Sequence, residues 1–158
     1  MSGEINIHAS CVAIGGCGVL LLGPSGSGKS DLALRLIDGG AKLVADDRTL
    51  VRVKSGRLHA SAPATIRGLI EIRGVGIVAM PVRASAPIAL VVELGREGAR
   101  LPQPRQWKPP KALAGPLKPA VFPPLLVLDA RLPSTPARIR AALAAHARGA
   151  FRDTFNQG

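Results

Sequence analysis

The chain has 158 residues, of which 47% are hydrophobic and 3% aromatic, and it carries a formal net charge of +11. This size fits a single domain spanning residues 1–158 with an aliphatic core, whereas no apolar run is long enough to cross a membrane. Because the first six residues lack the pattern of a secretory signal and the two cysteines are too few for a disulfide framework, we expect a cytoplasmic protein with reduced cysteines and no membrane partner.

The N-terminal part is predicted to hold two strands, a glycine-rich loop and a helix. Residues 5–14 are β-prone, and residues 18–22 form an apolar run typical of a buried strand. Residues 31–37 place apolar side chains at helical spacing, and Gly39-Gly40 ends that helix. The loop between strand and helix therefore has the flanks that a phosphate-binding loop requires.

This loop carries the pattern G-x-x-x-x-G-K-[ST] in full. Its residues are Gly23, Pro24, Ser25, Gly26, Ser27, Gly28, Lys29 and Ser30. In such a loop, backbone N–H groups and the N-terminus of the helix converge on a phosphate. Lys29 is expected to reach the β- and γ-phosphates, and the Ser30 hydroxyl to bind Mg²⁺. The pattern predicts binding of a nucleoside triphosphate or another polyphosphate.

Strands are predicted to dominate the middle of the chain. They are residues 42–45, the hairpin 49–53 and 57–60, and the central strand 88–94. Residues 68–78 are unusual, since one Glu, one Arg and three glycines interrupt their apolar positions. One strand–helix–strand unit followed by strands without helices predicts an α/β fold with a mixed β-sheet and few helices.

The C-terminal part changes character. Residues 95–124 hold eight of the fourteen prolines and predict a basic surface connection, followed by a strand at 125–128. A helix is expected over 137–146, and residues 149–158 are expected to be a frayed tail. Residues 95–158 carry eleven basic and three acidic residues, a charge that would suit nucleic acid, an acidic protein surface or counter-ions.

Asp46 and Asp47 follow directly after the strand at 42–45. In parallel α/β units this end of a strand lies beside the phosphate loop. One carboxylate would take a hydroxyl proton and the other would hold Mg²⁺, because adjacent side chains of a strand point to opposite sides. The alternative is an acidic turn that only leads into the hairpin.

Four other side chains are candidates for the same site or for a partner surface. Glu71 and Arg73 are two residues apart and would face one side of a strand, either as a site wall or as a plain salt bridge. Asp31 would favour the helix dipole and is placed to approach the metal. Trp107 is interpreted as a surface anchor for a partner.

These pieces together resemble the C-terminal catalytic domain of the HPr kinase/phosphorylase family. The matching elements follow in order and are His8-Ala9-Ser10, the loop 23–30, Leu43-Val44-Ala45-Asp46-Asp47 and Glu71-Ile72-Arg73-Gly74-Val75-Gly76-Ile77. The resemblance implies an α/β fold with a phosphate loop of the phosphoenolpyruvate-carboxykinase type. It also implies that ATP with Mg²⁺ phosphorylates a regulatory serine of the phosphocarrier protein HPr, and that many members also reverse this with inorganic phosphate. Many members are hexamers.

Residue by residue, the resemblance makes Asp46 the general base toward the serine hydroxyl and the general acid in the reverse direction. It assigns catalytic positions to Asp46, His8 and Arg73, nucleotide-binding positions to the loop 23–30, and metal positions to Ser30, Asp47 and Glu71. Two departures stand out. The chain resembles the short proteobacterial forms without an N-terminal domain, and Asp31 stands where many members have Glu. Candidates for the family's later basic loop are Arg96, Arg100 and Arg105.

Three alternatives remain open at this stage. A non-catalytic ATP sensor that signals through a partner would not need the base Asp46. A nucleic-acid-associated ATPase would use the basic C-terminal part, but the sequence lacks stacking aromatic residues, so we expect no specific nucleic-acid partner. A kinase with a different acceptor fits the same phosphate loop, which identifies the donor and not the acceptor.

Overall fold

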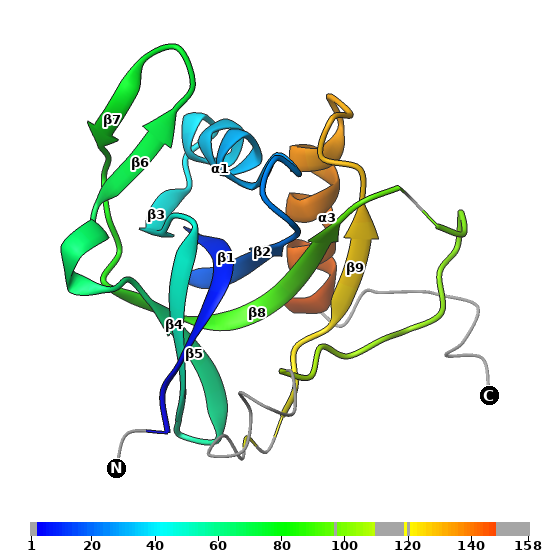
Figure 1. Ribbon diagram of the computed structural model, residues 1–158. Coiled ribbons are helices and arrows are strands. Elements are labelled where there is room, and N and C mark those ends of the chain that lie inside the picture. Colours follow the sequence, from blue (N-terminus) through cyan, green and yellow to red (C-terminus); the bar gives the residue numbers. More distant parts are fainter. Residues whose placement is uncertain (1–2, 97, 110–118, 120, 148–158) are drawn as a thin grey trace.

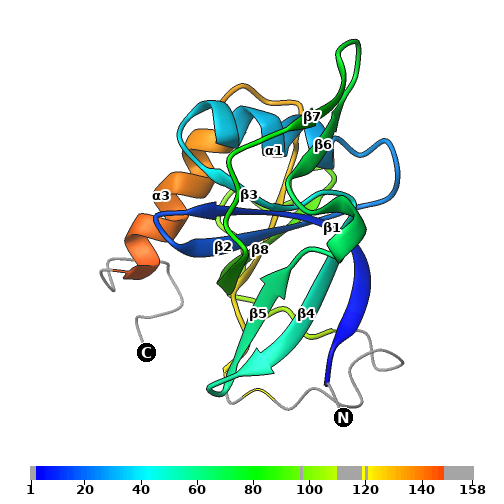
Figure 2. The ribbon, with the colours of Figure 1, turned by 90° about the vertical axis from the view of Figure 1, so that its left-hand side faces the viewer.

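The computed structural model describes residues 3–96, 98–109, 119 and 121–147, which form a large mixed sheet, a separate hairpin and two α-helices (Figures 1 and 2). The strands are β1 (Ile5–Ile14), β2 (Cys17–Leu22), β3 (Lys42–Ala45), β4 (Arg48–Lys54), β5 (Arg57–Ser61), β6 (Leu69–Ile72), β7 (Gly76–Ala79), β8 (Ser85–Leu94) and β9 (Leu125–Leu128). The helices are α1 (Lys29–Asp38), α3 (Thr135–Ala147) and a 3-10 turn at Ala64–Ile66. The predicted α/β fold with a mixed sheet and few helices is confirmed.

Strand directions place several chain segments at one edge of the sheet. β2 pairs with β8 in parallel and with β1 in antiparallel fashion, and β9 is parallel to β8. Both β3 and β4 pair antiparallel with β1, so they run in the same direction as β2. The carboxyl ends of β2, β3, β8 and β9 therefore face the same way, toward the N-terminus of α1.

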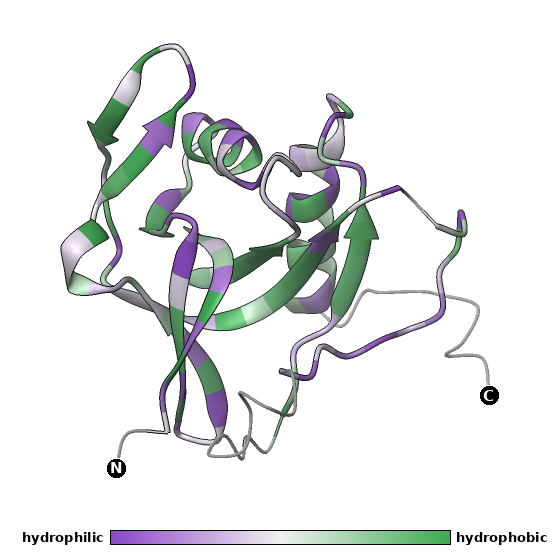
Figure 3. Cartoon of the chain, viewed as in Figure 1, coloured by the Kyte–Doolittle hydropathy of each residue, from purple (hydrophilic) through white to green (hydrophobic). Residues whose placement is uncertain are grey.

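Two hydrophobic clusters lie on opposite faces of the central strands. Val19 and Leu21 of β2 pack toward the helices, whereas Leu20 packs into a cluster enclosed by β1, β4, β5 and β8. These side chains are fully buried, as expected for a strand covered on both faces. Figure 3 shows hydrophobic colour along β2, β8 and β9 and alternating colour along the β4–β5 hairpin.

Helix α1 packs one apolar face on the sheet and ends at a glycine pair. Leu32, Ala33 and Leu36 face the sheet and are fully buried. The helix ends where the glycine pair predicts, with the Gly39 N–H donating to the Arg35 carbonyl at 3.2 Å.

No helix in the described part of the chain has the length and apolar content that crossing a bilayer requires.

The proline-rich connection is partly built into the sheet. The Trp107 N–H donates to the Pro123 carbonyl at 2.8 Å, and the Leu125 N–H donates to the Arg105 carbonyl at 2.9 Å. Trp107 is 7% exposed and belongs to the hydrophobic cluster enclosed by β1, β4, β5 and β8. The interpretation of Trp107 as a surface anchor is therefore wrong. The tail predicted at 149–158 lies outside the described residues.

The burial of Trp107, the single tryptophan of the chain, is directly measurable. We expect native fluorescence to be shifted to shorter wavelength than free tryptophan and to resist quenching by iodide. Denaturant should remove both properties. Native emission at the wavelength of free tryptophan, with full quenching, would contradict this placement.

Candidate active site

The phosphate loop connects the end of β2 to the start of α1 through glycines with left-handed backbone. Gly26 and Gly28 have φ values of 82° and 97°, where residues with a Cβ are strained. The loop closes on itself through the Ser27 N–H, which donates to the Pro24 carbonyl at 3.0 Å. A Cβ at Gly28 would lie 3.2 Å from the Cβ of Ala130, so this position is also tightly packed.

Lys29 places its ammonium inside the loop. Its Nζ donates to the carbonyls of Gly23 at 2.6 Å and Pro24 at 3.0 Å, and the residue is 5% exposed. Burial lowers the pKa of Lys29, and the attraction of Asp47 and Asp46 partly offsets this. A bound polyphosphate would add negative charge here and favour the protonated lysine.

A tight turn separates the two acidic side chains between β3 and β4. The Arg48 N–H donates to the Asp46 carbonyl at 2.8 Å, and Asp47 at the centre has a φ of 67°. This is a γ-turn with positive φ, which is rare and strained. As a result, Asp46 is 8% exposed, whereas the Asp47 side chain is 64% exposed.

The Asp46 carboxylate is the meeting point of four elements. Its Oδ1 accepts hydrogen bonds from the Ser30 hydroxyl at 2.6 Å and from the Ser10 hydroxyl at 3.0 Å. Its Oδ2 accepts from the Glu71 N–H at 3.2 Å. The end of β3 is thereby tied to the start of α1, to β1 and to β6. A carboxylate beside the last residue of the phosphate loop is placed to act on a group that approaches a bound phosphate.

His8 contacts the other aspartate. Its Nε2 lies 2.7 Å from Oδ1 of Asp47, and the two side chains are 33% and 64% exposed. The structure thus pairs Ser30 with Asp46 and His8 with Asp47. Asp31 turns elsewhere, because its Oδ2 accepts from Nε of Arg35 at 3.1 Å on the exposed face of α1.

Glu71 and Arg73 do not share a strand face as expected. Strand β6 ends at Ile72, and Arg73 lies in the turn that leads to β7. Ile70, 1% exposed, and the partly buried Ile72 pack this hairpin on the core, while its tip projects from the body (Figures 1 and 2). Glu71 reaches the site through its backbone N–H, and both side chains are exposed.

A further basic residue, Arg131, lies in the loop that packs against the phosphate loop, and the sequence reasoning missed it. The loop after β9 packs Ala130 against Gly28, and Arg35 of α1 donates to the carbonyls of Ala130 and Leu132. Arg131 in this loop is exposed, and its hydrogen bonds lower the pKa of Asp129 to about 2. The signal was available, because polar residues directly follow a strand here as they do at Asp46.

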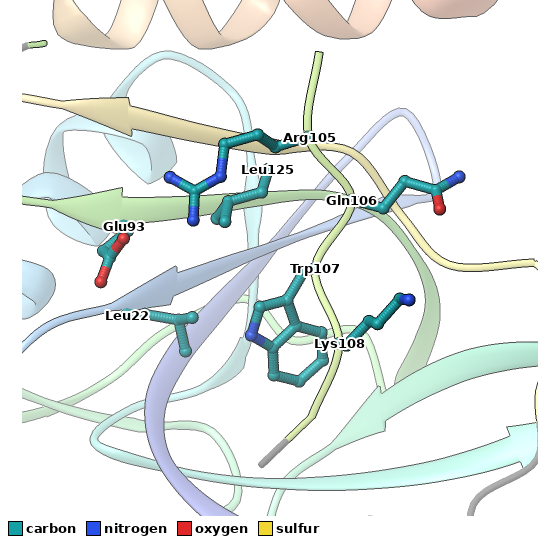
Figure 4. A pocket seen from close by; sticks show the side chains of 7 residues that line it. All are labelled: Leu22, Glu93, Arg105, Gln106, Trp107, Lys108 and Leu125. Carbon is teal, nitrogen blue, oxygen red and sulfur yellow. The ribbon is translucent and has the colours of Figure 1, made fainter. Parts of the chain in front are cut away.

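A pocket lies where β2 and β8 end, next to the residue that precedes the phosphate loop (Figure 4). Leu22, which directly precedes the loop, is paired with Glu93 across the two strands. Figure 4 shows both near the strand ends, with Trp107 between them and Lys108. The remaining wall is formed by Arg105, Gln106 and Leu125. Arg105, one of the arginines considered from the sequence, thus lines this pocket, and Arg96 and Arg100 are exposed.

The donor set beside the loop fits Mg²⁺. The described residues contain no cluster of three or more His, Cys, Asp or Glu that would form an all-protein cage. Mg²⁺ prefers oxygen ligands and is usually held by one or two carboxylates together with phosphates and water. The Ser30 hydroxyl and the Asp46 carboxylate, 2.6 Å apart, supply such oxygens at the phosphate loop.

Residues 1–100 match the family model of the HPr Serine kinase C-terminal domain. The chain belongs to this family. Among curated members, the HPr kinase/phosphorylase of Caldanaerobacter subterraneus subsp. tengcongensis is 46% identical over a 99-residue alignment that covers 58% of this chain and 32% of that protein. The HPr kinase/phosphorylase of Brevibacillus brevis is 45% identical over a 96-residue alignment that covers 56% of this chain and 31% of that protein. The chain thus spans about a third of the length of these relatives.

A solved structure shares the fold of this chain. The Hpr(Ser) kinase/phosphatase from Coxiella burnetii aligns with a TM-score of 0.71 and 25% sequence identity, covering 91% of this chain and 97% of that one. The family match includes the phosphate loop, the Asp46-Asp47 turn and the β6–β7 hairpin. The loop with Arg131 lies beyond the matched residues.

The packing of Gly28 gives a test of the loop with a matched control. In Gly28→Ala the new Cβ would lie 3.2 Å from the Cβ of Ala130, at a residue with φ 97°. In Gly40→Ala the new Cβ would have no atom within 4 Å, at a residue with φ 112°. Both changes strain the backbone by about 1–2 kcal/mol. We expect only G28A to weaken pyrophosphate binding, by about tenfold or more in calorimetry. Equal affinity of the two variants would contradict the tight packing of the loop.

Proposed function

We propose that this domain is an ATP- and Mg²⁺-dependent serine kinase that acts on the phosphocarrier protein HPr. The observation that carries the proposal is the 2.6 Å contact between the Asp46 carboxylate and the hydroxyl of Ser30, the last residue of the phosphate loop. The donor is inferred from the loop itself. The acceptor is inferred from the names of the relatives, which are HPr kinases.

In the proposed mechanism, loop N–H groups and Lys29 bind the triphosphate, with Lys29 leaving its carbonyl partners for phosphate oxygens. Asp46 accepts the proton of the acceptor serine while the serine oxygen forms a bond to the γ-phosphorus. The bond between that phosphorus and the bridging oxygen breaks, and ADP leaves. Bound Mg²⁺, held by Ser30 and a carboxylate of the acidic pair, would neutralise charge on the phosphate oxygens.

Phosphorolysis of the phosphoserine would use the same groups. Inorganic phosphate attacks the phosphoserine phosphorus, the serine oxygen takes the proton from Asp46, and pyrophosphate leaves. Arg131 beside the loop and Arg73 at the hairpin turn are proposed to supply positive charge for these anions. His8 is proposed to orient Asp47, which it contacts at 2.7 Å, and Glu71 stays a candidate metal ligand. A hexamer and a cytoplasmic location also remain predictions.

The deciding experiment is transfer from γ-labelled ATP to HPr from the same organism. We expect label on wild-type HPr with Mg²⁺ and none on an HPr variant whose regulatory serine is replaced by alanine. Addition of inorganic phosphate to labelled HPr should then release pyrophosphate. Bound ATP without label on either HPr would contradict the kinase and favour a sensor or another acceptor.

The metal role of Asp47 has a control in Asp31, an exposed aspartate that directly follows the phosphate loop in the sequence. We expect Asp47→Asn to raise the Mg²⁺ concentration for half-maximal transfer by about tenfold, because one anionic oxygen ligand is lost. Asp31→Asn should leave that concentration unchanged, since Asp31 is paired with Arg35. If D47N shows the wild-type requirement, Asp47 is not a ligand, and Asp46, which contacts Ser30, becomes the candidate ligand in its place.

A further inference from the structure

Ser10 is a buried polar residue of β1 that the proposed mechanism does not use. It is 0% exposed. Its hydroxyl donates to Oδ1 of Asp46 at 3.0 Å and accepts from the Asp47 N–H at 3.0 Å. One side chain therefore contacts both residues of the acidic turn.

Strand register places Ser10 opposite the turn. Cys11 is paired with Ala45 and His8 with Arg48, so Ser10 and Ala9 face Asp46 and Asp47 across the gap between β3 and β4. The Ala9 N–H donates to the Asp47 carbonyl at 3.0 Å, which is a backbone link between β1 and the turn. Only the Ser10 side chain links β1 to the Asp46 carboxylate among the described contacts.

The other two donors to Asp46 belong to segments outside the large sheet, and one of them would also contact a bound ion. Ser30 belongs to the phosphate loop, and its hydroxyl would also contact the ion that the proposed function requires. The Glu71 N–H belongs to the β6–β7 hairpin, which is separate from the large sheet, and it donates at 3.2 Å. Ser10 lies in the sheet and is closed off from solvent, so it does not touch substrate.

We propose that Ser10 is a positioning residue that holds the Asp46 carboxylate toward the phosphate loop and stabilises the γ-turn at Asp47. The proposal rests on the proposed kinase function for its consequence in catalysis. Ser10 acts through Asp46, because its hydroxyl donates a hydrogen bond to Oδ1 of Asp46 and accepts one from the Asp47 N–H. A misplaced general base costs rate and leaves nucleotide binding intact.

Three variants test this in the transfer assay. We expect Ser10→Ala to lower kcat by about 10- to 100-fold with the KM for ATP within about twofold, because the base is displaced while the loop is not. Ser10→Thr keeps the hydroxyl and should restore most of the rate. Thr49→Val is the matched control. Thr49 lies on β4, which pairs with β1, is as buried as Ser10 and donates its hydroxyl to the Ala9 carbonyl at 2.8 Å. Equal kcat in S10A and T49V would overturn the proposal.

Amide hydrogen exchange gives a readout that does not depend on activity. In Ser10→Ala the Asp47 amide loses its acceptor directly. The Glu71 amide, which bonds to the other oxygen of Asp46, should also exchange about tenfold faster or more, because the carboxylate is released. T49V should change neither amide. Unchanged Glu71 exchange in S10A would overturn the positioning role. If the wild-type protein transfers no phosphate but Glu71 still exchanges faster in S10A, only the proposed kinase function is overturned.

Discussion

The carboxylate of Asp46 accepts hydrogen bonds from the Ser10 hydroxyl, the Ser30 hydroxyl and the Glu71 N–H, and these donors come from β1, α1 and β6. A buried carboxylate is costly without such partners, and hydrogen bonds to a charged acceptor are among the stronger ones. The site therefore depends on three separate elements reaching one side chain. The γ-turn at Asp47 makes this possible, since it turns Asp46 inward while Asp47 faces solvent and His8.

Strand direction explains why the remaining chemistry gathers at the same place. β1 is antiparallel to β2, β3 and β4, and β8 and β9 are parallel to β2. The phosphate loop, the acidic turn and the loop with Arg131 thus all follow strands that end at one edge. Arg35 then joins two of these segments, because it donates from α1 to the carbonyls of Ala130 and Leu132.

Much of this follows from local sequence signals. The phosphate loop, its flanking strand and helix, and the position of Asp46-Asp47 after a strand are set by short-range patterns. Other features depend on contacts that no local pattern encodes. Trp107 is buried because distant residues Pro123 and Leu125 pair with its segment, and Arg73 lies in a turn because the hairpin reverses one residue earlier than alternation predicts. The pairing of His8 with Asp47 depends on the turn type at a single residue.

Asp46 is the group proposed to accept the serine proton, and the Asp46→Asn variant tests this role most directly. Asparagine keeps the size and the carbonyl acceptor but takes no proton, so we expect phosphate transfer to HPr to fall by at least about 100-fold. Affinity for a non-hydrolysable ATP analogue should stay within about threefold, since Lys29 and the loop are unchanged. Transfer by D46N at the wild-type rate would contradict the account.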